Sequence, residues 1–265
     1  LTRTARYSHT SRMNLISLQS GSNGNCIYVE TGDARLLFDA GISGKQAAAR
    51  LAGFGRDISR VDALIISHDH ADHVRCAGIY ARKFGVRLCV TEKTLAAACS
   101  SHDLGRLGDV EHFRSGGSLR FGDVRVETLP TPHDGADGVS FIIDDGVSRL
   151  GIFTDLGHVY GDLESALESV DAVLLESNYD PDMLMNGPYP RYLKSRIAGP
   201  RGHLSNIESA ELIARRGSRL RWACLGHLSG ENNTPELALR THRTINSGIE
   251  YHVAGRYGPG GILTV

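Results

Sequence analysis

The segment HDHADH, residues 68–73, carries three imidazoles and two carboxylates within six positions. It directly follows residues 62–66, a short apolar run that is typical of a buried strand. If the segment is extended, His68 and His70 point to the same side of the chain. Histidine and aspartate are ligands that zinc and similar divalent ions accept. A solvated polar loop is the alternative, but it does not explain so dense a cluster at the end of a core strand, so we predict a metal site.

This H-x-H-x-D-H segment, together with the aspartate that ends LLFD at position 39, resembles the metallo-β-lactamase fold. Members of that family place two β-sheets between outer layers of helices and bind two metal ions at one edge of the sandwich. The resemblance covers residues 14–265 and implies an α/β (α+β) protein with two mixed sheets flanked by helices, an αββα sandwich. The later family motifs occur in the expected order, in TPHDG, IFTDLG and LGHLS, each where a predicted strand ends.

The resemblance implies a role for each candidate ligand. Two divalent ions, zinc or manganese, would be held in two groups, the first by His68, His70 and His133 and the second by Asp72, His73 and His227. Asp155 would bridge the two ions, and Asp39 would orient a ligand from behind. The simpler alternatives are that His133 bonds to its own loop and that Asp155 caps a helix.

A second motif, RGHLSN, places His203 just before a predicted helix. GHLS followed by an Ala/Glu-rich helix resembles tRNase Z-type phosphodiesterases, in which the equivalent histidine donates a proton to the leaving oxygen. Together with SNYD, NGPYP and HLSGENN, it more narrowly resembles the YycJ (WalJ) subfamily of metal-dependent nucleases, described as 5′-exonucleases acting on DNA. The catalytic candidates are therefore Asp72 and His203. The alternative for His203 is a polar residue that merely lies beside Ser205 at the start of the helix.

No serine or cysteine nucleophile is apparent, since the chain contains no G-x-S-x-G sequence. The five cysteines form no C-x-x-C pair, and we expect buried, reduced thiols at Cys26, Cys76, Cys89, Cys99 and Cys224. The implied reaction needs no protein nucleophile, because a hydroxide held by two metal ions attacks the phosphorus.

Eight basic and two acidic residues lie between positions 191 and 221, in a chain whose formal net charge is −1. Tyr189 and Tyr192 lie among the first of these cations, and this mixture is typical of a groove for single-stranded nucleic acid. We predict four DNA contacts, from Arg191, Lys194, Arg196 and Arg201. The alternative is a solvated surface, since arginine supplies 25 of the 29 cations of this chain.

These features predict a metal-dependent phosphodiesterase, and within that class a cytoplasmic 5′ to 3′ DNA exonuclease. Two other functions stay open. One is a small-molecule hydrolase on the same fold, such as a phosphoribosyl cyclic phosphodiesterase or a glyoxalase II-like thioesterase. The other is a non-catalytic metal-binding accessory protein, against which the complete ligand set argues. No apolar stretch approaches the roughly 18 residues that a membrane span needs.

The elements between the motifs must bring them together. Strands are expected over residues 14–18, 26–30, 35–39, 62–66, 87–90, 124–129, 140–144, 149–154, 172–176, 222–225 and 251–254, and helices over 45–54, 74–84, 162–168, 206–216 and 235–245. Ser205 and Glu208 have the spacing of a capping box at the start of one of these helices. Runs of strands followed by alternating strands and helices predict sheets that are covered by helices.

The length of 265 residues and the hydrophobic fraction of 41% are those of a globular protein with a substantial core. We expect residues 13–265 to form one domain, since no Pro/Ser linker, repeat or low-complexity tract interrupts them. Residues 1–12 are polar and unpatterned, and they are expected to be a disordered leader, a mis-assigned start or an expression remnant.

Overall fold

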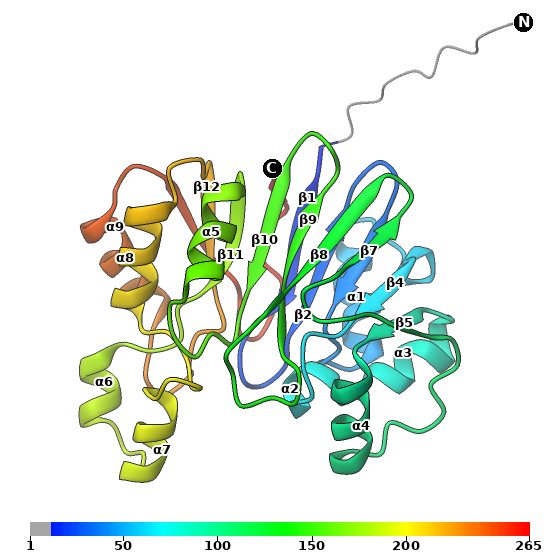
Figure 1. Ribbon diagram of the computed structural model, residues 1–265, viewed down its shortest axis with the longest axis horizontal. Helices are drawn as coiled ribbons and strands as arrows, with labels where there is room; N and C mark the ends of the chain where they lie inside the picture. The colour runs from blue at the N-terminus through cyan, green and yellow to red at the C-terminus, as the bar shows by residue number, and fades with distance from the viewer. Residues whose placement is uncertain (1–11) are drawn as a thin grey trace, which may run out of the picture.

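The computed structural model describes residues 12–265, so the leader expected over residues 1–12 lies, except for its last residue, outside the described chain. Two seven-stranded sheets stand face to face at the centre of the molecule (Figure 1). The first sheet, in the order β14-β1-β2-β3-β4-β5-β6, consists of β1 (Asn14–Gln19), β2 (Cys26–Glu30), β3 (Arg35–Phe38), β4 (Ala63–Ile65), β5 (Arg87–Val90), β6 (Val110–His112) and β14 (Leu263–Thr264).

The second sheet has the same number of strands, in the order β13-β12-β11-β10-β9-β8-β7. It consists of β7 (Ser118–Phe121), β8 (Val124–Pro130), β9 (Val139–Asp144), β10 (Arg149–Phe153), β11 (Ala172–Glu176), β12 (Trp222–Gly226) and β13 (Glu250–Val253). Two mixed sheets between helices are the predicted αββα architecture, which is confirmed.

The two sheets share one plan of strand directions. In the first, β14 to β3 pair antiparallel and β3 to β6 pair parallel. In the second, β7 to β10 pair antiparallel and β10 to β13 pair parallel. Neighbouring parallel strands end at the same edge of their sheet. The residues that follow β3 and β4 therefore lie close together at one edge of the first sheet. Those that follow β10, β11 and β12 lie close together at one edge of the second sheet.

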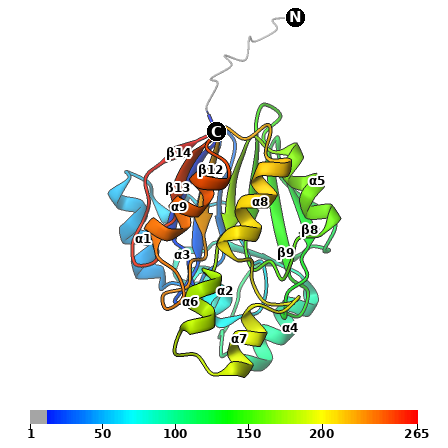
Figure 2. The ribbon, with the colours of Figure 1, turned by 90° about the vertical axis from the view of Figure 1, so that its left-hand side faces the viewer.

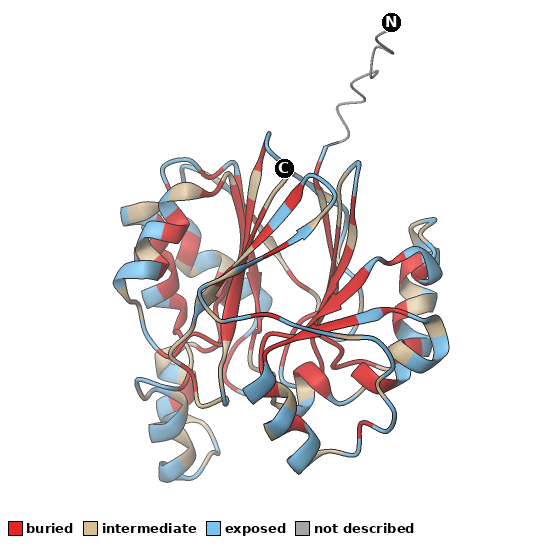
Figure 3. Cartoon of the chain, turned by 45° about the vertical axis from the view of Figure 1, so that its right-hand side comes forward, coloured by how far each residue is buried: buried red, intermediate tan, exposed pale blue. Residues whose placement is uncertain are grey.

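The sheets are apolar on both faces because each lies between two layers. In β4, Ala63 and Ile65 belong to the core between the sheets, whereas Leu64 belongs to the core beneath the outer helices. Phe38 and Phe141 meet across the sheets with their ring centroids 5.0 Å apart. Strands buried on both faces read as continuous apolar runs, which is why the sequence located most of them. Figure 3 shows the buried sheets between helices whose outer surfaces are exposed.

Helices cover the outer face of each sheet (Figures 1 and 2). Those over the first sheet are α1 (Gly44–Gly53), α3 (Ala77–Phe84) and α4 (Glu92–Ser101), and those over the second are α5 (Gly161–Ser169), α8 (Asn206–Arg216) and α9 (Pro235–Ile245). The predicted capping box is present, since Ser205 and Glu208 bond reciprocally at the start of α8. Among residues 12–265, no helix is long and apolar enough to cross a membrane.

The helix predicted over residues 74–84 is wrong at its start. The chain forms two helices there, α2 (Ala71–Val74) and α3, with a break at Arg75 and Cys76. The amide of Cys76 donates to the carbonyl of Ala40, so it leaves the helical ladder, and the Arg75 guanidinium binds the carbonyl of Gly41. Asp72 and His73 of the metal-site motif lie in α2, before this break.

The sequence did not predict the ten-residue helix α4 or several short elements, namely β6, β7, β14, the 3-10 turn Ile58–Arg60, α6 (Pro181–Asn186) and α7 (Arg191–Ile197). The last two form an arm, residues 181–202, that projects at the lower left of Figure 1, below the helices of the second sheet. Neither helix exceeds seven residues, and α7 has no buried residue. Because the arm has no repeating apolar face, its sequence has no hydrophobic periodicity from which its helices could be predicted.

The cysteines agree only in part with the expectation of buried thiols. All five are free, but Cys99 is exposed and Cys76 is half-buried. Cys99 lies on the outer layer, in α4, which has no second layer above it. Burial raises the pKa of Cys26 and of Cys224 to about 12, so these thiols stay protonated and unreactive.

Candidate metal centre

The HDHADH motif lies where the first sheet meets α2. His68 follows the short strand β4, and His70 is the N-cap of α2, which contains Asp72 and His73. The rings of His68 and His70 lie with their centroids 4.6 Å apart. The loop after β3 packs directly against α2, and a Cβ at Gly41 would overlap the Asp72 carbonyl. Glycine at that position therefore lets β3 and the motif come together.

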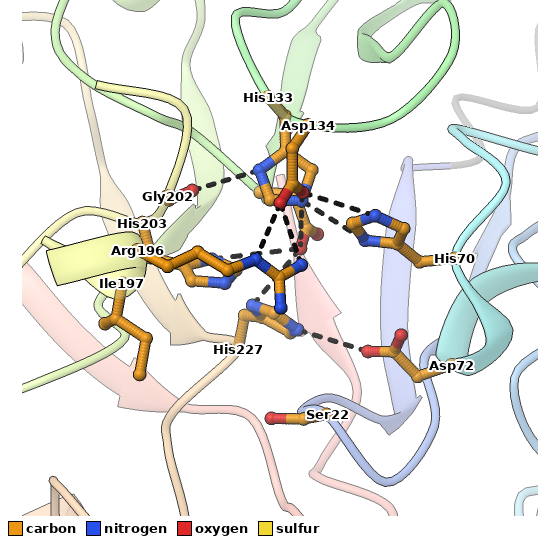
Figure 4. Close-up of a pocket in the computed structure, with 11 residues that line it drawn as sticks. Ser22, His70, Asp72, His133, Asp134, Arg196, Ile197, Gly202, His203 and His227 are labelled. Atoms are coloured by element: carbon orange, nitrogen blue, oxygen red, sulfur yellow. Dashed lines mark hydrogen bonds and ion pairs between the residues drawn. The ribbon is translucent and has the colours of Figure 1, made fainter. Parts of the chain in front are cut away.

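The structure brings all seven candidate ligands to one place. Figure 4 shows four of them, His70, Asp72, His133 and His227, around one pocket. Nε2 of His133 lies 3.3 Å from Nδ1 of His70, in a group that also contains His68. In the other group, Nε2 of His227 lies 3.5 Å from Oδ2 of Asp72. This second group also contains His73.

Asp155 lies between the two groups. Its Oδ2 is 3.3 Å from Nε2 of His73 in the second group, and its Oδ1 is 3.8 Å from Nε2 of His133 in the first. It also forms a potential metal-binding group with His68 and His73. One carboxylate that faces both sets of donors has the position that a bridging ligand needs.

Three donor atoms of this centre are buried without a hydrogen-bond partner among the described residues: Nε2 of His68, Oδ2 of Asp155 and Nε2 of His227. Buried polar atoms are costly when they are left unpaired. Burial lowers the pKa of His68 well below its usual value, which leaves a neutral imidazole with a free lone pair. These residues fit divalent cations, because cations would satisfy all three atoms at once.

Three candidate site residues, Asp39, Asp155 and His227, have left-handed backbone conformations, with φ of 64°, 59° and 54°. Within residues 12–265 they are the only non-glycine residues with positive φ. Asp39 and His227 come directly after β3 and β12, and Asp155 lies two residues after the end of β10. Such conformations cost free energy and persist where the surrounding structure enforces them, often at functional sites. Here they turn three side chains off the strand ends into one centre.

Asp39 lies behind the second group of donors. Its Oδ2 is 2.8 Å from Nδ1 of His73, and its carboxylate also accepts hydrogen bonds from the amide and hydroxyl of Ser67. This contact fixes the ring with Nδ1 toward Asp39 and Nε2 toward Asp155, and the Asn25 side-chain amide also lies 2.9 Å from Nε2. Burial alone would lower the pKa of His73, but Asp155, Asp39 and Asp72 raise it well above its usual value.

The loop that carries His133 is fixed from two sides. Nδ1 of His133 lies 3.0 Å from the carbonyl of Gly202, so this nitrogen carries the proton and Nε2 faces the centre. The guanidinium of Arg201 donates two hydrogen bonds to the His133 carbonyl. On the other side, Asp69 accepts a hydrogen bond from the amide of Ala136. Asp69, the one acid of the motif with no predicted role, therefore ties the His133 loop to the motif.

His203 lies at the rim of the same pocket, and its ring centroid is 5.2 Å from that of His133 and from that of His227. Nδ1 of His203 lies 2.8 Å from Oε1 of Glu176, the last residue of β11. The same oxygen lies 3.0 Å from Nδ1 of His227. Glu176 thus holds the far nitrogens of both rings and turns each Nε2 away from itself.

Glu176 was missed in the sequence. It is fully buried, and the amides of Leu156 and Leu204 donate to its Oε2. Burial alone would raise its pKa, but His203 and His227 lower it, so the carboxylate is charged. Its position in the sequence could have indicated a role, because Glu176 ends the apolar strand AVLLE. Asp155 and His227 have similar positions after the neighbouring strands.

The basic residues of the predicted segment fall into two groups in the structure, those of the arm and the later arginines. Arg196 lines the pocket and forms an ion pair with Asp134, while Lys194 donates to the Met185 carbonyl and Arg201 holds His133. Arg191 is exposed at the start of α7, beside Tyr192, which is 75% exposed. Three of the four later arginines pair with acids on neighbouring elements: Arg215 with Glu164, Arg216 with Glu164 and Glu168, and Arg219 with Asp171. The cations at the centre are therefore those of the arm.

A family model of the metallo-beta-lactamase superfamily matches residues 20–216, and the chain belongs to that superfamily. Among curated proteins, it is similar to the exodeoxyribonuclease WalJ of Streptococcus pneumoniae serotype 2, with 39% identity over 229 residues. The aligned region covers 84% of each of the two chains. It is 34% identical over 224 residues to the exodeoxyribonuclease YycJ of Bacillus anthracis, covering 83% of this chain and 84% of that protein. The predicted YycJ-like resemblance is confirmed.

The fold also matches solved structures with much lower sequence identity. The metallo-beta-lactamase fold protein YhfI from Bacillus subtilis superposes with a TM-score of 0.74 at 17% identity, over 95% of this chain and 99% of that one. Zinc-bound PqqB from Methylobacterium extorquens superposes with a TM-score of 0.70 at 16% identity, over 95% of this chain and all of the other. Both similarities concern the fold.

Proposed function

We propose that this protein is a metal-dependent exodeoxyribonuclease that hydrolyses phosphodiester bonds at a two-metal centre and digests DNA from the 5′ end. The observation that carries the proposal is the convergence of seven donor residues, with His203 and Arg196 at the rim of the same pocket. Relatives that share 34–39% identity over most of the chain are named exodeoxyribonucleases, which supports the activity and DNA as substrate.

The proposed first ion is held by His68, His70 and His133, the second by Asp72, His73 and His227, with Asp155 between them. Bound divalent ions would activate a water molecule and neutralise charge on the phosphate. Zinc and manganese both suit this mixture of imidazole and carboxylate donors. Asp72 and Asp155 supply the negative charge that two adjacent cations need.

His203 has the proposed role of proton donor to the leaving oxygen. It belongs to neither predicted triad of donors, and Glu176 fixes its Nδ1, so that its Nε2 is the nitrogen available to substrate. A buried carboxylate behind an imidazole sets its tautomer and orientation. Its place at the rim, with one-fifth of the side chain exposed, lets a bound substrate reach it.

Arg196 and Arg191 are proposed to bind phosphates of the DNA. Arg196 lines the pocket and its side chain is 61% exposed, so it can reach a phosphate at the centre. Arg191 and Lys194 lie on the same helix and extend the positive surface outward. Arg201 is proposed to act indirectly, since its hydrogen bonds go to the His133 carbonyl. We also propose that residues 13–265 work as a single domain and that the protein acts in the cytoplasm.

The experiment that tests this function compares three substrate classes at equal protein concentration. They are a 5′-phosphorylated oligonucleotide, a cyclic nucleotide-sized phosphodiester and a thioester, each with manganese, zinc or a chelator. The proposal expects turnover of the oligonucleotide that depends on added metal and greatly exceeds turnover of the other two. Preference for the cyclic diester or the thioester would indicate a small-molecule hydrolase, and metal binding without turnover of any substrate would indicate an accessory protein.

A further inference from the structure

Asp134 joins the first metal position to the arm. Its Oδ1 lies 3.2 Å from Nε2 of His70 and 3.3 Å from Nε2 of His133 (Figure 4). Its Oδ2 accepts from Arg196, with both Nε and Nη2 at 2.8 Å. The Asp134 carboxylate therefore contacts two candidate metal ligands with one oxygen and a cation of α7 with the other.

The orientation of the His70 ring makes this contact informative. His70 turns Nδ1 toward His133 and its other nitrogen, Nε2, toward Asp134. A carboxylate beside the far nitrogen of a metal-binding histidine holds the ring in one orientation. Oδ1 of Asp134 is buried and accepts no hydrogen bond within residues 12–265. This oxygen is directed at the two histidines, where a bound cation would satisfy it.

Arg196 is the residue that holds Asp134 in this place. Asp134 uses the Nε and Nη2 donors of the guanidinium, which leaves N–H groups on Nη1 for a second anion. The helix that carries Arg196 has no buried residue, so contacts such as this one, rather than a core, position it. The pocket places this guanidinium beside the metal centre, where a phosphodiester would lie.

The end of the arm is tied to the same metal position. The Gly202 carbonyl lies 3.0 Å from Nδ1 of His133, and the Arg201 guanidinium binds the His133 carbonyl. The arm folds back tightly there, since a Cβ at Gly202 would overlap the carbonyls of Arg196 and Ile197. Both ends of the segment from residue 196 to residue 202 thus contact the loop that carries His133 and Asp134.

We propose that Asp134 is a positioning residue through which Arg196 and the first metal position are coupled, so that a phosphate bound by the arm strengthens metal binding at His68, His70 and His133. The phosphate half of this inference rests on the proposed function, whereas the metal half does not. Coupling of this kind is reciprocal, so bound metal would strengthen phosphate binding by the same factor.

The test measures metal affinity in the full chain without DNA, by competition with a chromophoric zinc chelator. Asp134→Asn is expected to weaken the first zinc-binding step by about 10- to 100-fold. Arg196→Ala is expected to weaken it by a smaller factor, and the double variant to match Asp134→Asn, since both act through one contact. Arg240→Ala, which removes an exposed cation from α9, serves as the control and should bind zinc like the wild type.

Circular dichroism would verify that each variant is folded. Unchanged zinc affinity in folded Asp134→Asn, or losses that simply add in the double variant, would overturn the inference. The same titration is repeated with a nuclease-resistant phosphorothioate oligonucleotide. It should tighten zinc binding in the wild type and not in Arg196→Ala, and equal tightening in both would contradict the coupling. An oligonucleotide that fails to bind the wild type would contradict the proposed function while leaving the zinc result interpretable.

Discussion

Nδ1 of His203 lies 2.8 Å from Oε1 of Glu176, and the same oxygen lies 3.0 Å from Nδ1 of His227. One buried carboxylate therefore orients a candidate metal ligand and a candidate proton donor together. Because β11 and β12 are paired in register, with Glu176 opposite Gly226, the strand geometry itself brings this acid beside the residue that follows β12. The candidate proton donor and the candidate ligand His227 are thus held by the last residue of one strand, β11.

Replacing Glu176 by glutamine should lower the rate of cleavage by about 10- to 100-fold. Glutamine fills the same volume, but it removes the charge that holds Nδ1–H of both histidines and the amides of Leu156 and Leu204. Initial rates on an oligonucleotide would measure the effect. Glu168→Gln, on the outer surface of α5, is the control and should be unaffected. Full activity of Glu176→Gln would show that the carboxylate does not orient His203.

His203→Ala should keep its metals and still bind DNA, yet cleave about 10²- to 10⁴-fold more slowly. The defect should shrink on a nitrophenyl phosphodiester, whose leaving group needs no proton. His158→Ala provides a matched control, because His158 is an exposed histidine whose Nδ1 bonds to Pro200 of the same arm. Loss of metal in His203→Ala, or an equal defect on both substrates, would make His203 a ligand instead.

Asp155→Ala should reduce the metal content from about two ions per chain to one or fewer, because this side chain faces both groups of donors. Elemental analysis of purified protein measures the content. Asp162→Ala, at the start of α5, is the control and should keep the wild-type content. A full complement of metal in Asp155→Ala would contradict the bridging position.

Removing Arg191 and Lys194 together should weaken DNA binding and flatten its salt dependence. Each lost phosphate contact reduces the slope of log K against log salt by about 0.7 for single strands. Fluorescence anisotropy over a range of salt concentrations gives the slope. Arg216→Ala with Arg219→Ala, where the cations already pair with acids, should leave it unchanged. Equal slopes for both double variants would assign the segment to ordinary solvated surface.

The sequence predicted the features that depend on residue type and on the local hydrophobic pattern. The HDHADH motif and the acids and histidines that end apolar strands pointed to the centre, and strands buried on both faces stood out as apolar runs. The partners of Asp134 could not be found this way. Two of them, Arg196 and His70, lie 62 and 64 positions away in the chain, and the arm that carries Arg196 has no repeating apolar face.

Glu176 shows a different limit. Its position after an apolar run was visible, but nothing local distinguishes an acid that supports two histidines from one that merely ends a strand. The break between α2 and α3 likewise depends on Ala40, 36 residues earlier, which accepts the Cys76 amide. Such features arise from contacts between distant segments, which only the folded chain brings together.

The central claim, metal-dependent digestion of DNA from its 5′ end, is tested most directly with a 5′-phosphorylated oligonucleotide labelled separately at each end. Protein stripped by chelator and reloaded with manganese or zinc should release the 5′ label first, as a mononucleotide, while the 3′ label stays in long fragments. The stripped protein and Asp155→Ala should release neither. Early release of the 3′ label, cleavage that persists in chelator, or intact DNA with both metals would contradict the account.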